Sequence, residues 1–302
     1  MVIAVILWAA LGVFILFPLY KLLHLTFVRD GVFSFDSITR ILSRKGNRLA
    51  LGNSLKLGLS VSVLGTLVGF IFAFTRTRAN LSKVWRLFLD AIIVLPLISP
   101  PFTLALAMLF TFGPRGFLTY QVLGMRGSSI YGMWSTLFAQ TLTFFPLAYM
   151  TLRGVLENID LSLEENAFSM GGSRWHVFRT VTLPLAIPGI ANSLLLVFSA
   201  SLADFAIPLV LAGHQFPVLP TQAYLQITGL FDLQGGASLS FILLVPSLLV
   251  FVLQRYWVSR KHYVTVTGKS SSGSETPLVN NWARYGLLGL CLAISALILL
   301  LY

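Results

Sequence analysis

The sequence predicts an all-α, polytopic membrane protein. Of its 302 residues, 56% are hydrophobic and only 10% are charged, and the mean hydropathy is +0.85. Soluble domains need roughly 25% charged residues to keep their surface wetted, so an ordinary soluble domain is excluded. Apolar runs of about 20 residues, the length that crosses a hydrocarbon core, lie at roughly 3–24, 53–75, 87–110, 130–152, 186–211, 236–254 and 285–302.

We expect each of these runs to be a helix, because backbone groups in lipid must be paired within the segment itself. A transmembrane barrel would instead show ten-residue stretches of alternating hydrophobicity. Gly65 and Gly69 form a small-xxx-small pair, which predicts the close approach of a neighbouring helix. The single cysteine, Cys291, lies in an apolar run and excludes a disulfide scaffold.

The net charge of +11 comes from basic residues in short segments between apolar runs. This placement indicates anionic membrane lipids, not nucleic acid, as the partner of the positive charge. The basic segments 76–86, 153–179 and 255–284 predict a cytoplasmic side, which also holds the N-terminus. A basic cluster within 29–48 conflicts with this orientation, but the three other basic segments together favour it.

The segment 157–184 is the most informative part of the sequence. Ser162 and Glu165 fit a capping box, and Glu164 and Glu165 suit the positive end of a helix dipole. An apolar stripe follows at helical spacing, and Gly171 is expected to end the helix. Such a helix either docks into a partner groove or lies on the lipid interface, anchored by Trp175 and Arg179.

The same segment resembles the EAA loop of binding-protein-dependent ABC importer permeases. The family pattern is E-A-A, three residues, G, nine residues, then I-x-L-P. Here it reads Glu165-Asn166-Ala167, three residues, Gly171, nine residues, then Val181-Thr182-Leu183-Pro184. The spacing fits throughout, while Asn166 and Val181 depart mildly from the pattern.

The resemblance implies a six-helix, MetI-like permease core, here followed by a seventh C-terminal apolar helix. It implies that the loop couples to a separate cytoplasmic ABC ATPase dimer, which binds ATP and Mg, so this chain needs no cofactor, catalytic residue or metal ligand of its own. Further implied partners are a periplasmic solute-binding protein and a second permease half, in a bacterial inner membrane. The residues carried over to the ATPase-coupling loop are Glu164, Glu165, Ala167, Gly171, Leu183 and Pro184.

A narrower resemblance to iron(III)-type permeases covers residues 201–208, 219–224 and 263–269. It favours ferric iron as the solute, although permeases for polyamines, thiamine, sulfate or phosphonates share much of the pattern. Because iron(III)-type permeases commonly fuse two modules, we expect residues 1–263 to form one permease module. A polar Ser/Gly-rich linker at 264–284 and the start of a second module at 285–302 are expected to follow.

Two polar residues within the spans are candidates for the solute pathway. Asp204 is the one carboxylate well inside the predicted fifth span, where a charge is costly and therefore points to function. Gln140 in the fourth span is the second candidate. The competing interpretation is structural hydrogen bonding between helices. Asp90, near the start of the third span, is explained by the helix dipole.

Two other classes of protein are alternatives to an ABC permease. An ion-coupled secondary transporter predicts paired discontinuous helices with charges near the midplane, and only Asp204 favours it. An integral membrane enzyme needs catalytic polar residues at one depth, which the sequence does not show. The scattered histidines (His24, His176, His214 and His262) have no metal-site spacing.

Overall fold

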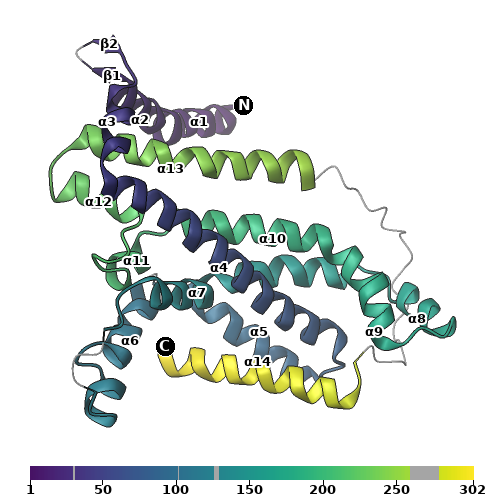
Figure 1. Cartoon of the computed structure of the whole chain (residues 1–302). Coiled ribbons are helices and arrows are strands. Elements are labelled where there is room, and N and C mark those ends of the chain that lie inside the picture. Colours follow the sequence, from purple (N-terminus) through teal and green to yellow (C-terminus); the bar gives the residue numbers. More distant parts are fainter. Residues whose placement is uncertain (30, 101, 126–128, 259–278) are drawn as a thin grey trace.

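A computed structural model describes residues 1–29, 31–100, 102–125, 129–258 and 279–302. Long helices run side by side in one bundle, and the connecting segments gather at its two ends (Figure 1). The elements are α1 (Val2–Leu11), η1 (Gly12–Leu16), α2 (Phe17–Phe27), β1 (Val28–Arg29), β2 (Val32–Phe33), α3 (Asp36–Ser43), α4 (Lys45–Arg78), α5 (Lys83–Ile98), α6 (Phe102–Phe112), η2 (Phe117–Val122), α7 (Met133–Glu157), α8 (Leu161–Ser169), α9 (Arg174–Val177), η3 (Phe178–Thr182), α10 (Leu183–Ala203), α11 (Ala206–Leu211), α12 (Leu219–Thr228), α13 (Leu233–Leu253), η4 (Gln254–Val258) and α14 (Asn281–Leu301).

The described part of the chain is an all-α membrane protein with several spans, as the sequence predicts. Its one sheet is a short antiparallel hairpin of β1 and β2. Six of its helices are long and apolar enough to cross a membrane: Ala4–Phe27, Lys45–Arg78, Phe102–Val122, Arg174–Ala203, Leu233–Tyr256 and Asn281–Leu301. Many of their large apolar side chains are exposed, which suits a surface that faces lipid.

The centre of the bundle is formed by α4, α7 and α10, which pack against one another. The predicted run 130–152 corresponds to α7, whose buried polar side chains make it less apolar than those six helices. A Cβ added to Gly69 of α4 would lie 2.8 Å from Ala148 Cβ and from Tyr149 N of α7. The close approach predicted for the glycine pair is therefore confirmed at Gly69.

The predicted third span, 87–110, is wrong because the chain breaks inside it. Helix α5 ends at Ile98, and α6 begins at Phe102. Ser99 has extended backbone angles and directly precedes Pro100. Proline disfavours helical geometry at the residue before it and lacks the N–H that a helix interior uses, so the span divides here.

Helix α14 packs against α4, α5 and α6, and lies beside α5 along much of its length (Figure 1). The Cys291 thiol donates a weak hydrogen bond of 3.6 Å to Thr75 Oγ1 of α4. Most of the predicted linker 264–284, and the whole of the 263–269 resemblance, fall in 259–278, outside the described residues. The assignment of 285–302 to a second module stays a prediction.

The connections group at the ends of the bundle as the charge pattern predicts. One end holds α8, α9, the α4–α5 connection and the start of α14 (Figure 1). The opposite end holds the β1–β2 hairpin, α3, α12 and η2. The membrane side that each end faces remains a prediction from the charges.

Candidate functional site

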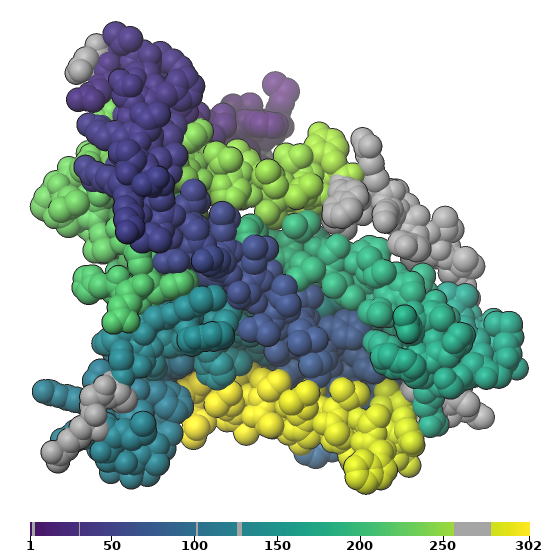
Figure 2. Space-filling model, viewed as in Figure 1, coloured from purple at the N-terminus to yellow at the C-terminus, as the bar shows by residue number. Residues whose placement is uncertain are grey.

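The segment 157–184 forms a compact projection at one end of the bundle, built from α8, α9 and η3 (Figures 1 and 2). Helix α9, η3 and α10 together make one continuous helix, Arg174–Ala203, of 30 residues. The projection is thus attached directly to a helix of the bundle core. Any displacement of the projection acts on that helix.

The start of α8 differs from the predicted capping box. Asp160 is the N-cap, and its Oδ1 accepts a hydrogen bond of 2.9 Å from the Ser162 backbone N–H. Ser162 itself lies inside the first turn. An aspartate two residues upstream takes the cap position because its carboxylate satisfies an unpaired N–H and suits the positive helix end.

The end of α8 is formed at Gly171, as predicted. Gly171 has φ +86°, a left-handed conformation that favours glycine. Its N–H donates to the Phe168 carbonyl at 2.8 Å, and the Gly172 N–H donates to the Ala167 carbonyl at 3.0 Å. This bonding pattern is a Schellman motif, which turns the chain sharply from α8 into α9.

Ala167 and Gly171 lie together on an open hollow between α8 and the α9–η3 segment. Its volume is about 540 Å³. Apart from its chain neighbours, no atom of the described residues lies within 4 Å of where a Gly171 Cβ would be, so the turn is open to a partner. Its lining residues are Ala167, Met170, Gly171, Gly172, Ser173, His176, Thr180 and Val181. This small-residue concavity can receive a protruding element of another protein.

The two adjacent acidic residues of α8 point into different environments. Glu165 is partly exposed, whereas Glu164 is only 3% exposed and faces the bundle. Glu164 Oε1 accepts hydrogen bonds from Arg78 Nε at 3.1 Å and from Thr182 Oγ1 at 2.9 Å. Of the two acids predicted for a partner contact, only Glu165 is accessible in this conformation.

Leu183 and Pro184 lie where the long helix enters the bundle, away from the hollow. They are the first residues of α10 and follow the π-helical segment η3 directly. Both side chains are partly buried. Their position suits them to set the angle at which the projection leaves the bundle.

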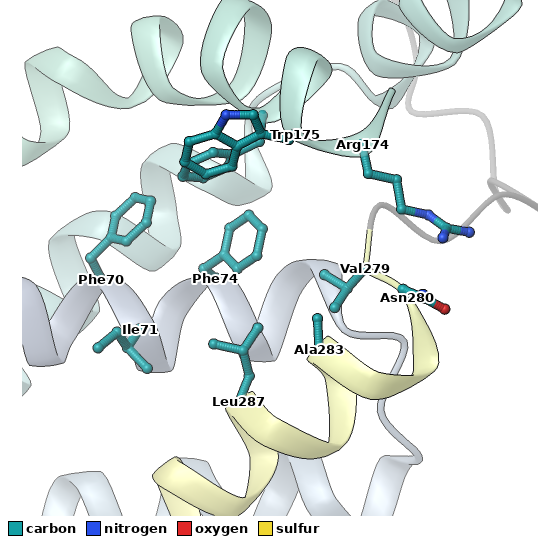
Figure 3. A pocket seen from close by; sticks show the side chains of 10 residues that line it. Phe70, Ile71, Phe74, Arg174, Trp175, Val279, Asn280, Ala283 and Leu287 are labelled. Atoms are coloured by element: carbon teal, nitrogen blue, oxygen red, sulfur yellow. The ribbon is translucent and has the colours of Figure 1, made fainter. Parts of the chain in front are cut away.

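An apolar groove of about 340 Å³ lies beside the projection, between α4, α14 and the α9–η3 segment (Figure 3). Trp175 stacks on Phe178 with ring centroids 5.5 Å apart, and Phe70 and Phe74 face them from α4. Trp175 remains 68% exposed. An exposed aromatic residue beside basic ones also fits a lipid interface, so this geometry alone keeps both interpretations of the segment open.

The two candidate pathway residues, Gln140 and Asp204, are brought into direct contact. Gln140 Nε2 donates a hydrogen bond of 2.8 Å to Asp204 Oδ2, and Ser201 Oγ donates one of 2.6 Å to Gln140 Oε1. The placement of Asp204 inside a continuous fifth span is wrong. It lies between α10 and α11, where its Oδ1 accepts from the N–H groups of Ala206 and Ile207.

Asp90 is the centre of an ionic cluster that sequence reasoning missed. It lies in the middle of α5, so the helix-dipole explanation is wrong. Its carboxylate accepts from Tyr149 Oη, from Arg76 Nε at 3.3 Å and from Arg153 Nη1 at 3.2 Å. The cluster ties α4, α5 and α7 together near the projection. The available signal for it in the sequence is that Arg76 and Arg153 directly follow the apolar runs 53–75 and 130–152.

Among the described residues, no three His, Cys, Asp or Glu side chains gather into an arrangement suited to a metal ion. His262 lies outside those residues. Near the proposed pathway, the described polar side chains of Gln140, Ser201 and Asp204 are joined by hydrogen bonds.

Comparison with known proteins adds independent findings. A family model described as "Binding-protein-dependent transport system inner membrane component" matches residues 65–263. The putative ferric transport system permease protein FbpB 1 of Haemophilus influenzae is 33% identical over 92% of this chain and 44% of its own length. FbpB of Actinobacillus pleuropneumoniae is 34% identical over 88% of this chain and 39% of its own. The chain thus spans less than half the length of these relatives.

A shorter relative, the molybdenum transport permease ModB of Escherichia coli K12, is 29% identical over 68% of this chain and 91% of its own. A solved bacterial ABC transporter involved in importing the polysaccharide alginate has the same fold. It superposes with a TM-score of 0.72, covering 87% of this chain and 94% of its own, at 17% identity.

Proposed function

Because the chain belongs to the family of binding-protein-dependent transport system inner membrane components, we propose that it is the permease subunit, or the first module of one, of an ABC importer in a bacterial inner membrane. A periplasmic binding protein delivers the solute, and a separate cytoplasmic ATPase dimer, which holds ATP and Mg, drives alternating access. The observation that carries this proposal is the open α8–α9 projection at one end of a transmembrane bundle.

The hollow between α8 and α9 is proposed as the contact with the ATPase. Ala167 supplies a small side chain that allows close approach, and Gly171 supplies the sharp turn that exposes it. Glu165, the accessible acid of the first helical turns, presents charge to the partner. Leu183 and Pro184 fix the direction of the attached helix. An amphipathic helix that docks into a groove of its partner is a familiar mode of protein recognition.

Ferric iron is the favoured solute, supported by the two relatives that carry ferric transport in their names and match most of this chain. Relatives named for molybdenum and sulfate match with lower identity, so oxyanions are the alternative. Asp204 and Gln140 are proposed to line the pathway. A second permease half is proposed to complete it, either as a module that begins at 285–302 after the polar linker 264–284 or as a separate chain.

Docking at the hollow is tested by Gly171→Asp in the full native chain. Gly124→Asp is a matched control, because Gly124 also has positive φ (+64°) and no atom of the described part of the chain within 4 Å of its Cβ position, but lies at the other end of the bundle. Both variants carry similar backbone strain, of about 1–2 kcal/mol. We expect both to insert in the membrane and only Gly171→Asp to lose association with the co-expressed ATPase, measured by affinity pull-down.

Equal ATPase recovery with Gly171→Asp and with wild type would contradict the docking assignment. Equal loss with both glycine variants would show that backbone strain, not the site, causes the effect. That result would also contradict the assignment.

A further inference from the structure

A buried ion pair joins the projection to the longest helix of the bundle. Arg78 is the last residue of α4, and its Nε donates to Glu164 Oε1 of α8 at 3.1 Å. The two side chains are 5% and 4% exposed. Thr182 of η3 donates to the same carboxylate oxygen at 2.9 Å. One carboxylate therefore holds three elements, α4, α8 and η3, together.

Stability alone does not explain why a charged pair occupies this position. A buried ion pair loses its hydration, and an apolar pair of similar volume often serves stability equally well. Arg78 Nη2 is also buried with no hydrogen-bond partner in the described structure, so the guanidinium is not fully satisfied. What a charged, hydrogen-bonded pair supplies is direction, because it holds one helix end in one orientation against another.

We propose that Glu164 is a positioning residue that locks α8 to the end of α4 through Arg78, so that the projection and α4 move as one body. The inference rests on the proposed function in one respect, since the ATPase supplies the displacement. Glu164 then passes that displacement on without contacting the ATPase. Glu164 is buried and is not among the residues that line the hollow with Ala167 and Gly171.

The path beyond Arg78 leads to the centre of the bundle. Helix α4 has 34 residues and extends about 51 Å, longer than the hydrocarbon core. Its backbone contacts α7 closely at Gly69, and α7 carries Gln140, which bonds Asp204. Since close-packed helices transmit displacement, movement of the Arg78 end reaches the proposed pathway.

The rigid link is tested on the permease itself, without an ATPase. Spin labels at Met170→Cys (83% exposed) and Leu67→Cys (54% exposed) on a Cys291→Ser background report the distance between the projection and α4 by pulsed electron resonance in nanodiscs. We expect one narrow distance distribution with native Glu164 and at least a twofold broader one with Glu164→Ala. Glu157→Ala, which removes an exposed ion pair with Arg153, is the control and leaves the width unchanged. Equal widths for Glu164→Ala and native Glu164 overturn the proposal.

Coupling is tested in proteoliposomes that contain the full native chain and its ATPase, with Fe(III)-loaded binding protein. We expect Glu164→Ala and Arg78→Ala to recruit the ATPase normally and to lower iron uptake per ATP hydrolysed about tenfold. The exchange Arg78→Glu with Glu164→Arg should restore much of that ratio. If both single variants keep the wild-type ratio of iron uptake to ATP hydrolysis, the positioning role of Glu164 is overturned, while the proposed function is not. A wild-type complex that recruits no ATPase overturns the proposed function, while the spin-label result still judges the rigid link.

Discussion

Gln140 in α7 donates a hydrogen bond of 2.8 Å to Asp204, the residue at which the chain breaks between α10 and α11. The Gln140 side chain is fully buried, and its carbonyl oxygen accepts from Ser201 Oγ. The break and the polar side chains therefore belong to one feature. Non-helical backbone at membrane depth is tolerated where polar groups satisfy it, and here Asp204 does so.

The first prediction separates the charge of Asp204 from its bonding. Asp204→Asn keeps an acceptor oxygen for the Ala206 N–H, and its new NH2 group can donate to Gln140 Oε1 once the Gln140 amide flips, so thermal stability should stay within about 1 kcal/mol of wild type. If the charge serves the solute, uptake should fall about tenfold. Asp204→Ala should destabilise the bundle by about 1–3 kcal/mol, because buried donors lose their acceptor.

Thermal unfolding in detergent and solute uptake in proteoliposomes measure the two effects. If Asp204→Asn takes up solute as fast as wild type, Asp204 has a purely structural role.

The second prediction concerns the contact between α4 and α7. Gly69→Ala places a methyl group 2.8 Å from atoms of Ala148 and Tyr149, which forces the helices apart and should cost about 1–3 kcal/mol. Gly52→Ala on the same helix meets nothing within 4 Å and should be neutral or stabilising by about 0.5–1 kcal/mol. Detergent melting curves compare the two variants. Equal melting temperatures would refute the close packing.

The third prediction is a pH dependence at the start of α13. Asp232 is its N-cap, and the hydrogen bond from the Gly235 N–H lowers the pKa of the Asp232 carboxyl below its usual value. A lowered folded-state pKa stabilises the fold above the unfolded pKa of about 4, and this contribution is lost as the pH falls through the folded value. Asp232→Asn keeps the cap but does not titrate.

Melting temperatures of wild type and Asp232→Asn should therefore agree near pH 7, and wild type should lose more stability below about pH 4. Parallel curves across that range would be inconsistent with the role of the cap.

The fourth prediction tests the cluster around Asp90. Asp90→Ala removes the acceptor shared by Arg76, Tyr149 and Arg153, and should destabilise the protein by about 1–3 kcal/mol. Glu157→Ala breaks only an exposed pair and should cost about 0–1 kcal/mol. Unfolding in detergent ranks the two variants. A smaller effect for Asp90→Ala would mean that the cluster adds nothing.

The sequence predicts the spans well where local chemistry decides, because an apolar run of sufficient length has few alternatives to a membrane helix. It fails where two signals compete within one run. The runs 87–110 and 186–211 are apolar on average, but Pro100 and Asp204 interrupt them, and a hydropathy pattern does not register backbone geometry.

In the candidate site, too, features set by neighbouring residues are predictable from the sequence, and contacts between distant residues are not. The role of Gly171 is predictable because a helix end in the left-handed conformation favours glycine, and this preference depends only on a few neighbouring residues. The partner of Glu164 is not, since Arg78 is 86 residues distant and only the packed fold brings them together. Two adjacent glutamates look equivalent in the sequence, yet the fold buries one and leaves the other accessible.

Purification of the tagged full-length protein in mild detergent tests whether this chain is the membrane permease of an ATP-driven importer. Mass spectrometry then identifies the chains that co-purify. We expect a stoichiometric ABC ATPase, which Gly171→Asp releases. A clean preparation without any ATPase, which transports its solute alone under a proton or sodium gradient, would contradict the proposed function and indicate a secondary transporter.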